Sequence, residues 1–171
     1  MIRKIGAAAG ASVFFFLAGA AHAVDGIAVE VGYGDDRTSM IRFSITDNWR
    51  KREPATREWR LAGYWEFSAG LWDNKEESTA EIAITPVFRL ERSRLYLEAA
   101  IGAHLVQAHI SAHRTFSTAF QFGEHLGAGY RFGPGQRYDL GLRLQHISNG
   151  GLSKPNPGIN FAIVRLQYDL E

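Results

Sequence analysis

The amino-acid sequence predicts an all-β protein, an eight-stranded antiparallel transmembrane β-barrel. Bulky apolar and polar side chains alternate with a period of two along most of the chain, the pattern of strands with two unlike faces. Charged side chains of both signs gather on the face opposite the bulky apolar ones. An export leader opens the chain, so the apolar face can meet the lipid of an outer membrane while the polar face fills a narrow lumen.

The N-terminal segment has the features of a secretory signal peptide. Two basic residues precede an apolar run over residues 5–21, and an Ala-His-Ala cleavage site ends at residue 23. We therefore expect residues 1–23 to be a signal peptide and residues 24–171 to form one outer-membrane barrel domain of about 148 residues.

The composition excludes several classes of protein. Of 19 basic side chains two belong to the leader, which leaves 17 against 18 acidic ones and a net charge of −1, without the basic excess of a nucleic-acid binder. The chain has no cysteine, so after export it must fold without disulfides. No run of about 20 apolar residues follows the leader, so no membrane-spanning helix is expected.

Eight segments show the alternation and are separated by polar or glycine-rich turns. The predicted strands cover residues 26–34, 41–46, 59–71, 81–90, 95–105, 120–132, 138–148 and 162–170.

The first four strands each have one bulky apolar parity. Valine and tyrosine alternate with small and acidic residues in 26–34, and isoleucine and phenylalanine alternate with arginine, serine and threonine in 41–46. Residues 59–71 present tryptophan, leucine and phenylalanine on one face. Isoleucine, phenylalanine and leucine do the same in 81–90, where Pro86 lacks a ladder donor and predicts a bulge.

The last four strands repeat the pattern. Leucine, alanine and isoleucine alternate with tyrosine, glutamate and histidine in 95–105, and aromatic residues alternate with glycine, glutamine and histidine in 120–132. In 162–170 aliphatic residues alternate with arginine, glutamine and aspartate. Polar, glycine-rich or proline-rich stretches predict loops at 107–117 and 149–158.

The polar parities carry charges of both signs, which can pair inside a narrow barrel. These residues are Glu30, Arg42, Glu66, Glu81, Arg89, Glu98, Arg143 and Arg165. Their mixture with glycine and alanine suits a crowded interior and favours a membrane barrel over its alternative, a secreted soluble barrel of lipocalin type with the apolar face inside.

The strand at 138–148 places two chemically active residues on its apolar face. Leu140, Leu142 and Leu144 share their parity with His146 and Ser148. With the N-terminus in the periplasm this strand rises about 25 Å, so the pair lies at the outer leaflet, which is lipopolysaccharide in a Gram-negative outer membrane. The pair is either a functional site facing lipid or simply the end of the apolar band.

Residues 146–158 carry the pattern H-x-S-N-x-G-L-x-x-P-N-x-G, which resembles the C-terminal signature of the PagL family, the outer-membrane lipid A 3-O-deacylases. Residues 120–133 resemble the family's preceding strand. The resemblance implies an eight-stranded barrel with a serine esterase site on its outer wall. It implies hydrolysis of the ester-linked 3-hydroxyacyl chain at position 3 of lipid A, with lipopolysaccharide and outer-membrane lipid as partners and no cofactor.

The resemblance also implies residue roles. Ser148 matches the nucleophile and His146 the base, and Asn149 with the backbone of Gly151 matches the oxyanion hole. The roles are chemically sensible, because a serine hydroxyl needs a base to take its proton and the oxyanion needs hydrogen-bond donors. No Gly-x-Ser-x-Gly elbow is present, so an α/β-hydrolase is not expected. The sequence is compatible with a homodimer.

One position departs from the family pattern. Where the family has a glutamate that orients the histidine, this chain has Asn160. Three interpretations stay open: Asn160 accepts the imidazole N–H through its amide oxygen, Glu124 on the apolar face of its strand substitutes, or the enzyme is weak or inactive. The loss of a triad aspartate to asparagine in a serine protease, through a wrong tautomer, lowers activity by about 10⁴-fold.

Two weaker candidates and a competing function remain. His104, His109 and His113 superficially resemble a metal cluster, but no metal is expected because they straddle a strand end and a loop. Lys154, in the loop beside the pair, is expected to attract a lipid A phosphate. The competing function is a non-catalytic barrel with a role in adhesion or envelope structure.

Overall fold

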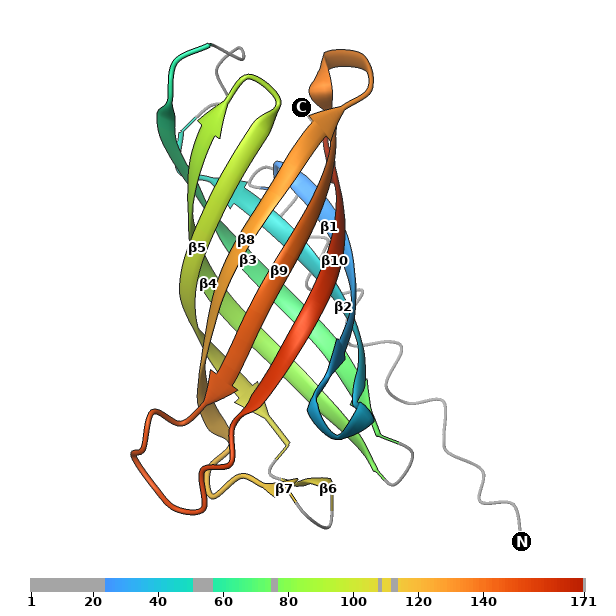
Figure 1. Ribbon diagram of the computed structural model, residues 1–171, viewed down its shortest axis with the longest axis vertical. Coiled ribbons are helices and arrows are strands. Elements are labelled where there is room, and N and C mark those ends of the chain that lie inside the picture. Colours follow the sequence, from blue (N-terminus) through green and yellow to red (C-terminus); the bar gives the residue numbers. More distant parts are fainter. Residues whose placement is uncertain (1–23, 51–56, 75–76, 108, 112–113, 171) are drawn as a thin grey trace, which may run out of the picture.

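The computed structural model describes residues 24–50, 57–74, 77–107, 109–111 and 114–170, and in these residues eight antiparallel strands close into a barrel (Figure 1). The barrel strands are β1 (Gly26–Gly34), β2 (Ser39–Asn48), β3 (Arg60–Asp73), β4 (Ser78–Arg92), β5 (Leu95–Val106), β8 (Phe120–Phe132), β9 (Tyr138–Ser148) and β10 (Ile159–Asp169). β1 closes the barrel by pairing with β10. The predicted signal peptide lies outside the described residues.

The predicted strands are confirmed, and those at 26–34, 120–132 and 138–148 have the bounds of β1, β8 and β9. The loop predicted at 107–117 contains a short hairpin of β6 (His109–Ser111) and β7 (Arg114–Thr115), strands too short to show a periodicity. Two 3₁₀ turns, η1 (Asp35–Arg37) and η2 (Pro134–Gln136), join neighbouring strands. No helix in the described part of the chain has the length and apolarity to cross a membrane.

The bulge predicted at Pro86 is wrong. β4 pairs Ile84 with Ala103 and Val87 with Ala100, so the register with β5 is the same on both sides of the proline. On its other side β4 pairs Pro86 directly with a residue of β3. The missing N–H is accommodated by a gap of two residues in the β4–β5 pairing rather than by an inserted residue.

The apolar faces of the strands form the outer wall. Leu140, Leu142 and Leu144 of β9 are 47%, 64% and 71% exposed, whereas all eight charged side chains predicted to face the lumen are buried. This arrangement confirms the transmembrane barrel, because a soluble barrel would bury the leucines and expose the charges.

The buried charges pair with one another across the lumen. Arg143 donates from Nε to Glu98 at 2.6 Å and from Nη1 to Glu66 at 3.0 Å, and Arg42 donates from Nη1 to Glu30 at 3.0 Å. A charge buried without a partner would be strongly destabilising, so the pairing is what allows a polar interior. We call this set the lumen network.

An apolar cluster fills the lumen at the end that carries the β9–β10 loop, which we call the loop end. This apolar plug consists of Met40, Trp72, Val106, Phe116, Ile147, Ile159, Phe161 and Ile163. Ile147 and Phe161 belong to the same strand ends as the outward-facing His146 and Asn160, and both are at most 2% exposed. Packing of the apolar plug therefore holds these strand ends from inside.

Aromatic residues gather on the wall at the opposite end of the barrel, which we call the turn end. Trp49 meets Trp65 and Phe88 edge to face, with ring centroids 6.2 and 4.9 Å apart. Phe132 and Tyr138 stack at 5.4 Å. Such rings at strand ends form the aromatic girdle expected at a membrane interface.

Candidate active site

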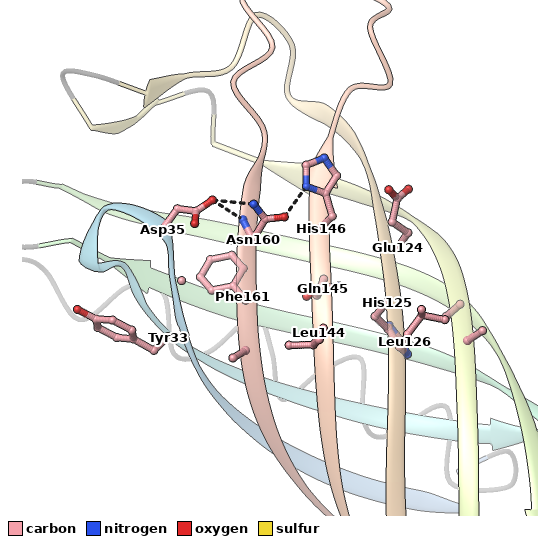
Figure 2. Close-up of a pocket in the computed structure, with 14 residues that line it drawn as sticks. Tyr33, Asp35, Glu124, His125, Leu126, Leu144, Gln145, His146, Asn160 and Phe161 are labelled. Atoms are coloured by element: carbon pink, nitrogen blue, oxygen red, sulfur yellow. Dashed lines mark hydrogen bonds between the residues drawn. The ribbon is translucent and has the colours of Figure 1, made fainter.

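Four polar side chains lie in a row across the outer wall near the loop end (Figure 2). They are Asp35 of η1, Asn160 of β10, His146 of β9 and Glu124 of β8. The strand register forms this row, because β9 pairs His146 with Asn160 on one side and with Glu124 on the other. Asp35 directly follows Gly34, the last residue of β1, which pairs with Phe161 beside Asn160.

Hydrogen bonds connect three members of the row. Nδ1 of His146 lies 2.8 Å from Oδ1 of Asn160. Asn160 donates to Oδ2 of Asp35 from its backbone N–H at 3.0 Å and from Nδ2 at 2.9 Å. The contact between asparagine and histidine is therefore formed as the first of the three sequence interpretations required, and it has an acidic partner behind it (Figure 2).

Sequence reasoning did not find Asp35, although a signal was present. The outward parity of β1, which includes Val31 and Tyr33, extends to residue 35, and a closed barrel makes the first strand a neighbour of the last. An acidic residue directly after a strand is usually a solvated turn residue. For this reason Asp35 was not predicted to belong to the site.

Ser148 stands at the end of β9, two residues beyond His146 and with the same outward parity. It is partly buried, and its Oγ accepts a hydrogen bond from the backbone N–H of Gly150 at 3.3 Å. Within the described residues no hydrogen bond joins Ser148 to His146. Hydrogen bonds of this kind are often long before substrate binds.

Asn149 points into the barrel and is fully buried. Its Nδ2 donates to Oγ of Ser117 at 3.0 Å and to the backbone oxygen of Ser153 at 2.8 Å. Its Oδ1 accepts the backbone N–H of Gly151 at 2.9 Å. Both groups expected at an oxyanion hole thus bond to the β9–β10 loop or to Ser117 in this structure, and a pattern based on sequence spacing gave no sign of these contacts.

The loop after Ser148 depends on glycine at three positions. Gly150, Gly151 and Gly158 have φ angles of 63°, 82° and 61°, in the left-handed region that side chains disfavour. A Cβ on Gly158 would lie 2.7 Å from Cε1 of His146, so this glycine also leaves room for the imidazole. The absence of a Cβ at Gly158 therefore leaves space beside the Cε1–Nε2 edge of the ring.

Glu124 faces outward on β8, directly across from His146, and is exposed. Within the described residues it makes no hydrogen bond to the imidazole, whose Nδ1 is held by Asn160. The geometry therefore favours Asn160 over Glu124 as the partner of His146.

A groove of about 630 Å³ begins at this row and runs down the outer wall. His146, Asn160, Asp35 and Glu124 lie at its polar end. The rest is mainly apolar, with lining residues that include Tyr33, Ala99, Leu126, Leu144 and Ala162. The polar row is therefore continuous with an apolar surface.

Known proteins match this chain over most of its length. The sequence model of the family described as lipid A 3-O-deacylase (PagL) matches residues 39–169, which include seven of the eight barrel strands. The chain belongs to the PagL family. The matched range covers His146, Ser148 and Asn160 and begins after Asp35.

Individual relatives point to the same family. A protein of Bordetella bronchiseptica described as lipid A deacylase PagL is 37% identical over 111 residues, which are 63% of this chain and 57% of that protein. A Pseudomonas aeruginosa protein of the same description is 29% identical over 139 residues, 78% of this chain and 79% of the relative.

Solved structures agree as well. The crystal structure of the outer membrane enzyme PagL matches with a TM-score of 0.74 and 25% identity, over 85% of this chain and 99% of that one. A designed transmembrane β-barrel, 14% identical over 85% of this chain and 93% of its own, reaches 0.54 and shows the fold alone. Fold and PagL family together place this chain in the outer membrane.

Among the remaining sequence candidates, the side chains of His104 and Lys154 lie within the described residues. His104 is buried in the lumen, with Nδ1 3.5 Å from Glu81, and His113 lies outside the described residues, as does the side chain of His109. In the described part of the chain no three histidine or acidic side chains are grouped to hold a metal ion. Lys154 is exposed in the β9–β10 loop.

Proposed function

We propose that this protein is a lipid A 3-O-deacylase, a serine esterase that hydrolyses the ester-linked 3-hydroxyacyl chain at position 3 of lipid A. One observation carries the proposal: in a member of the PagL family, the imidazole of His146 is held through Nδ1 by Asn160 at 2.8 Å, two residues from a serine on the same lipid-facing wall. Nε2 is the nitrogen left for Ser148.

The reaction follows the serine esterase scheme. Nε2 of His146 takes the proton of Ser148 as Oγ attacks the ester carbonyl carbon. The bond between that carbon and the sugar oxygen then breaks, and the imidazolium gives its proton to the departing oxygen. Water, deprotonated by His146, attacks the acyl-serine, releases the 3-hydroxy fatty acid and restores the hydroxyl of Ser148.

The oxyanion of the tetrahedral intermediate needs preorganised donors. The family resemblance implies Asn149 and the backbone of Gly151, to which we add the backbone N–H of Gly150, 3.3 Å from Oγ of Ser148. The Gly151 N–H donates to Oδ1 of Asn149 at 2.9 Å. Nδ2 of Asn149 donates to Ser117 and Ser153 at 3.0 and 2.8 Å, so both donors reach an oxyanion only when these bonds open. Gly150 and Gly151, both left-handed, give this part of the loop the backbone freedom for such a change.

The groove suits the acyl chain of the substrate and the ester that carries it. Its apolar part, with Leu126, Leu144 and Ala162, accepts an acyl chain, and its polar end presents His146 to the ester. The longest connection between barrel strands, residues 107–119 between β5 and β8, lies at the loop end, and long loops are typical of the outer side of an outer-membrane barrel. We therefore propose that the site works at the outer leaflet, where the lipid A esters lie.

Asn160 is proposed as the residue that orients His146. An amide oxygen can hold the Nδ1–H tautomer, as the asparagine of Cys-His-Asn proteases does. It stabilises imidazolium less than a carboxylate would, so a carboxylate elsewhere in the row matters. Glu124 stays as the second candidate, because it stands opposite His146 in register.

Mass spectrometry of lipid A tests the proposal. Cells of a Gram-negative host expressing the protein should lose one 3-hydroxyacyl chain from lipid A, and the Ser148→Ala variant should lose none. Purified protein in detergent, assayed on isolated lipid A, removes the influence of the host membrane. Unchanged lipid A in both assays, with a folded barrel, would favour the non-catalytic envelope barrel instead.

A further inference from the structure

The contact between Asp35 and Asn160 has a property that matters for His146. Both N–H groups of Asn160, backbone and side chain, point at the same carboxylate oxygen, at 3.0 and 2.9 Å. The Asp35 side chain is 39% exposed, so the carboxylate is only partly solvated. Two donors on one oxygen hold the amide in a single position.

A carboxylate determines which end of an amide faces it. An ionised carboxylate only accepts hydrogen bonds, so the NH₂ group of Asn160 must face Asp35 and its Oδ1 must face the imidazole. An amide oxygen also only accepts, so His146 must carry a proton on Nδ1. In the neutral ring Nε2 is then unprotonated and can serve as a base.

We propose that Asp35 is a positioning residue of the esterase site, which acts through Asn160 to fix the imidazole tautomer of His146. This inference rests on the proposed function. It also accounts for an asparagine at position 160, because the negative charge of the triad then stands one hydrogen bond further from the histidine, on η1. Polarisation along the chain of hydrogen bonds carries part of its influence to the ring.

The surroundings of Asp35 keep its carboxylate directed at Asn160. Arg114 of β7 donates from Nε to Asp36 at 2.7 Å and donates from Nη1 to the backbone oxygen of Gly158. Its nearest approach to the Asp35 carboxylate is 3.8 Å. The cation is thus engaged mainly by Asp36, and Asp35 is left to accept from Asn160.

The first test compares two neighbouring aspartates. Asp35→Asn should lower kcat by about tenfold to a hundredfold, the range for partners that orient an imidazole from outside, with KM changed less than about twofold. Asp36→Asn removes a charge from the same turn but keeps an oxygen that accepts from Arg114, so kcat should fall less than in Asp35→Asn. Equal losses in both variants would mean that the turn matters only for structure, and would overturn the inference.

The second test moves the charge. In the Asn160→Glu background a carboxylate contacts the imidazole directly and lies against Asp35, so adding Asp35→Asn should leave kcat unchanged or raise it. A loss of kcat in the wild-type background, with no loss in the Asn160→Glu background, would show that the residues act as one unit. A similar loss in both backgrounds would contradict the proposal.

The third test does not depend on activity. Nitrogen-15 NMR of histidine-labelled protein, refolded in detergent, reports the tautomer of each ring, and comparison with His146→Gln assigns the resonance among the five histidines of residues 24–171. The wild type should show the Nδ1–H form, and Asp35→Asn a mixture with the Nε2–H form. An unchanged tautomer in Asp35→Asn would overturn the inference.

Wild-type activity that Ser148→Ala abolishes, with kcat and tautomer unchanged in Asp35→Asn, would reject the role of Asp35 and leave the esterase intact. Intact lipid A with the wild type would reject the esterase.

Discussion

The lumen and the outer wall use the same kinds of side chain in opposite ways. In the lumen Glu98 is bound by Arg89 at 2.8 Å and by Arg143 at 2.6 Å, and all three are nearly inaccessible. On the wall Asp35 is partly exposed and binds an amide, with its nearest arginine at 3.8 Å. The lumen neutralises its charges in place, whereas the wall leaves a charge available to act on a neighbour.

This difference between lumen and wall indicates that the paired charges of the lumen contribute to stability and that the residues of the wall carry the chemistry. A buried carboxylate held by two guanidinium groups has no freedom to exchange protons or partners, so it contributes to a fixed interior. On the wall, by contrast, a chain of hydrogen bonds runs from Asp35 through Asn160 to Nδ1 of His146. Changes in the two regions should therefore affect different measurements.

The largest expected effect is the loss of chemistry without loss of fold. His146→Gln removes the base while keeping a side chain that can bond to Asn160, and kcat should fall about 10³-fold or more, as for residues that act as a unit. The unfolding midpoint in detergent should stay at the wild-type value. Fatty acid release and thermal unfolding measure the two; retention of a tenth of the activity would contradict the assigned role.

The converse effect, loss of stability without loss of activity, is expected from a substitution in the lumen. Arg143→Met leaves Glu66 and Glu98 buried without their shared partner and should lower the free energy of unfolding by about 3–5 kcal/mol. Activity per folded molecule should remain. Denaturant unfolding measures the change, with Arg137→Met, at an exposed position of the turn end, as control. A variant as stable as the wild type would mean that the lumen network is not what holds the interior.

A smaller effect is expected from Gly158→Ala, which presses on the imidazole from the loop. The new Cβ would lie 2.7 Å from Cε1 of His146, and displacement of the ring by about 1 Å can lower kcat by about 100-fold. Gly135→Ala has a similar φ, 62° against 61°, but far from the site, and should change stability only. Steady-state kinetics on lipid A distinguish displacement of the imidazole from backbone strain at the substituted glycine. Equal kinetics in the two variants would exclude displacement of the imidazole.

The smallest effect is expected at the rim of the site. Lys154 is exposed, so its attraction for a lipid A phosphate is screened, and Lys154→Ala should raise KM by about two- to fivefold with kcat unchanged. The difference should vanish with a lipid A substrate that lacks phosphates. An unchanged KM on the phosphorylated substrate would remove Lys154 from the binding surface.

Much of the fold could be predicted because alternation is a local property. The parity of Leu140, Leu142 and Leu144 assigns the lipid-facing wall of β9 without knowledge of any other strand, and the buried charges follow from the opposite parity. Pro86 shows the limit of local reasoning, since the partner strands accommodate a missing donor by a gap that no pattern in β4 reveals.

Part of the candidate site could likewise be recognised from the sequence, and part could not. The pair of His146 and Ser148 and the loop signature after it are contiguous in sequence, so they could be recognised directly. Asn149 could be matched to the family pattern, but its inward direction and its bonds to Ser117 and Ser153 depend on how the long loop folds against the strand ends. Spacing along the chain does not contain that information.

The sequence by itself determined which face of each strand meets lipid and which strand carries a serine and a histidine toward it, because the period of two is set by the covalent backbone. Only the tertiary structure decided that Asp35 stands beside Asn160, 125 positions away, and that Asn160 stands beside His146. That outcome depends on the register in which β1, β10 and β9 pair. A slip of one residue would turn every side chain to the other face, so only the closed barrel could align the row.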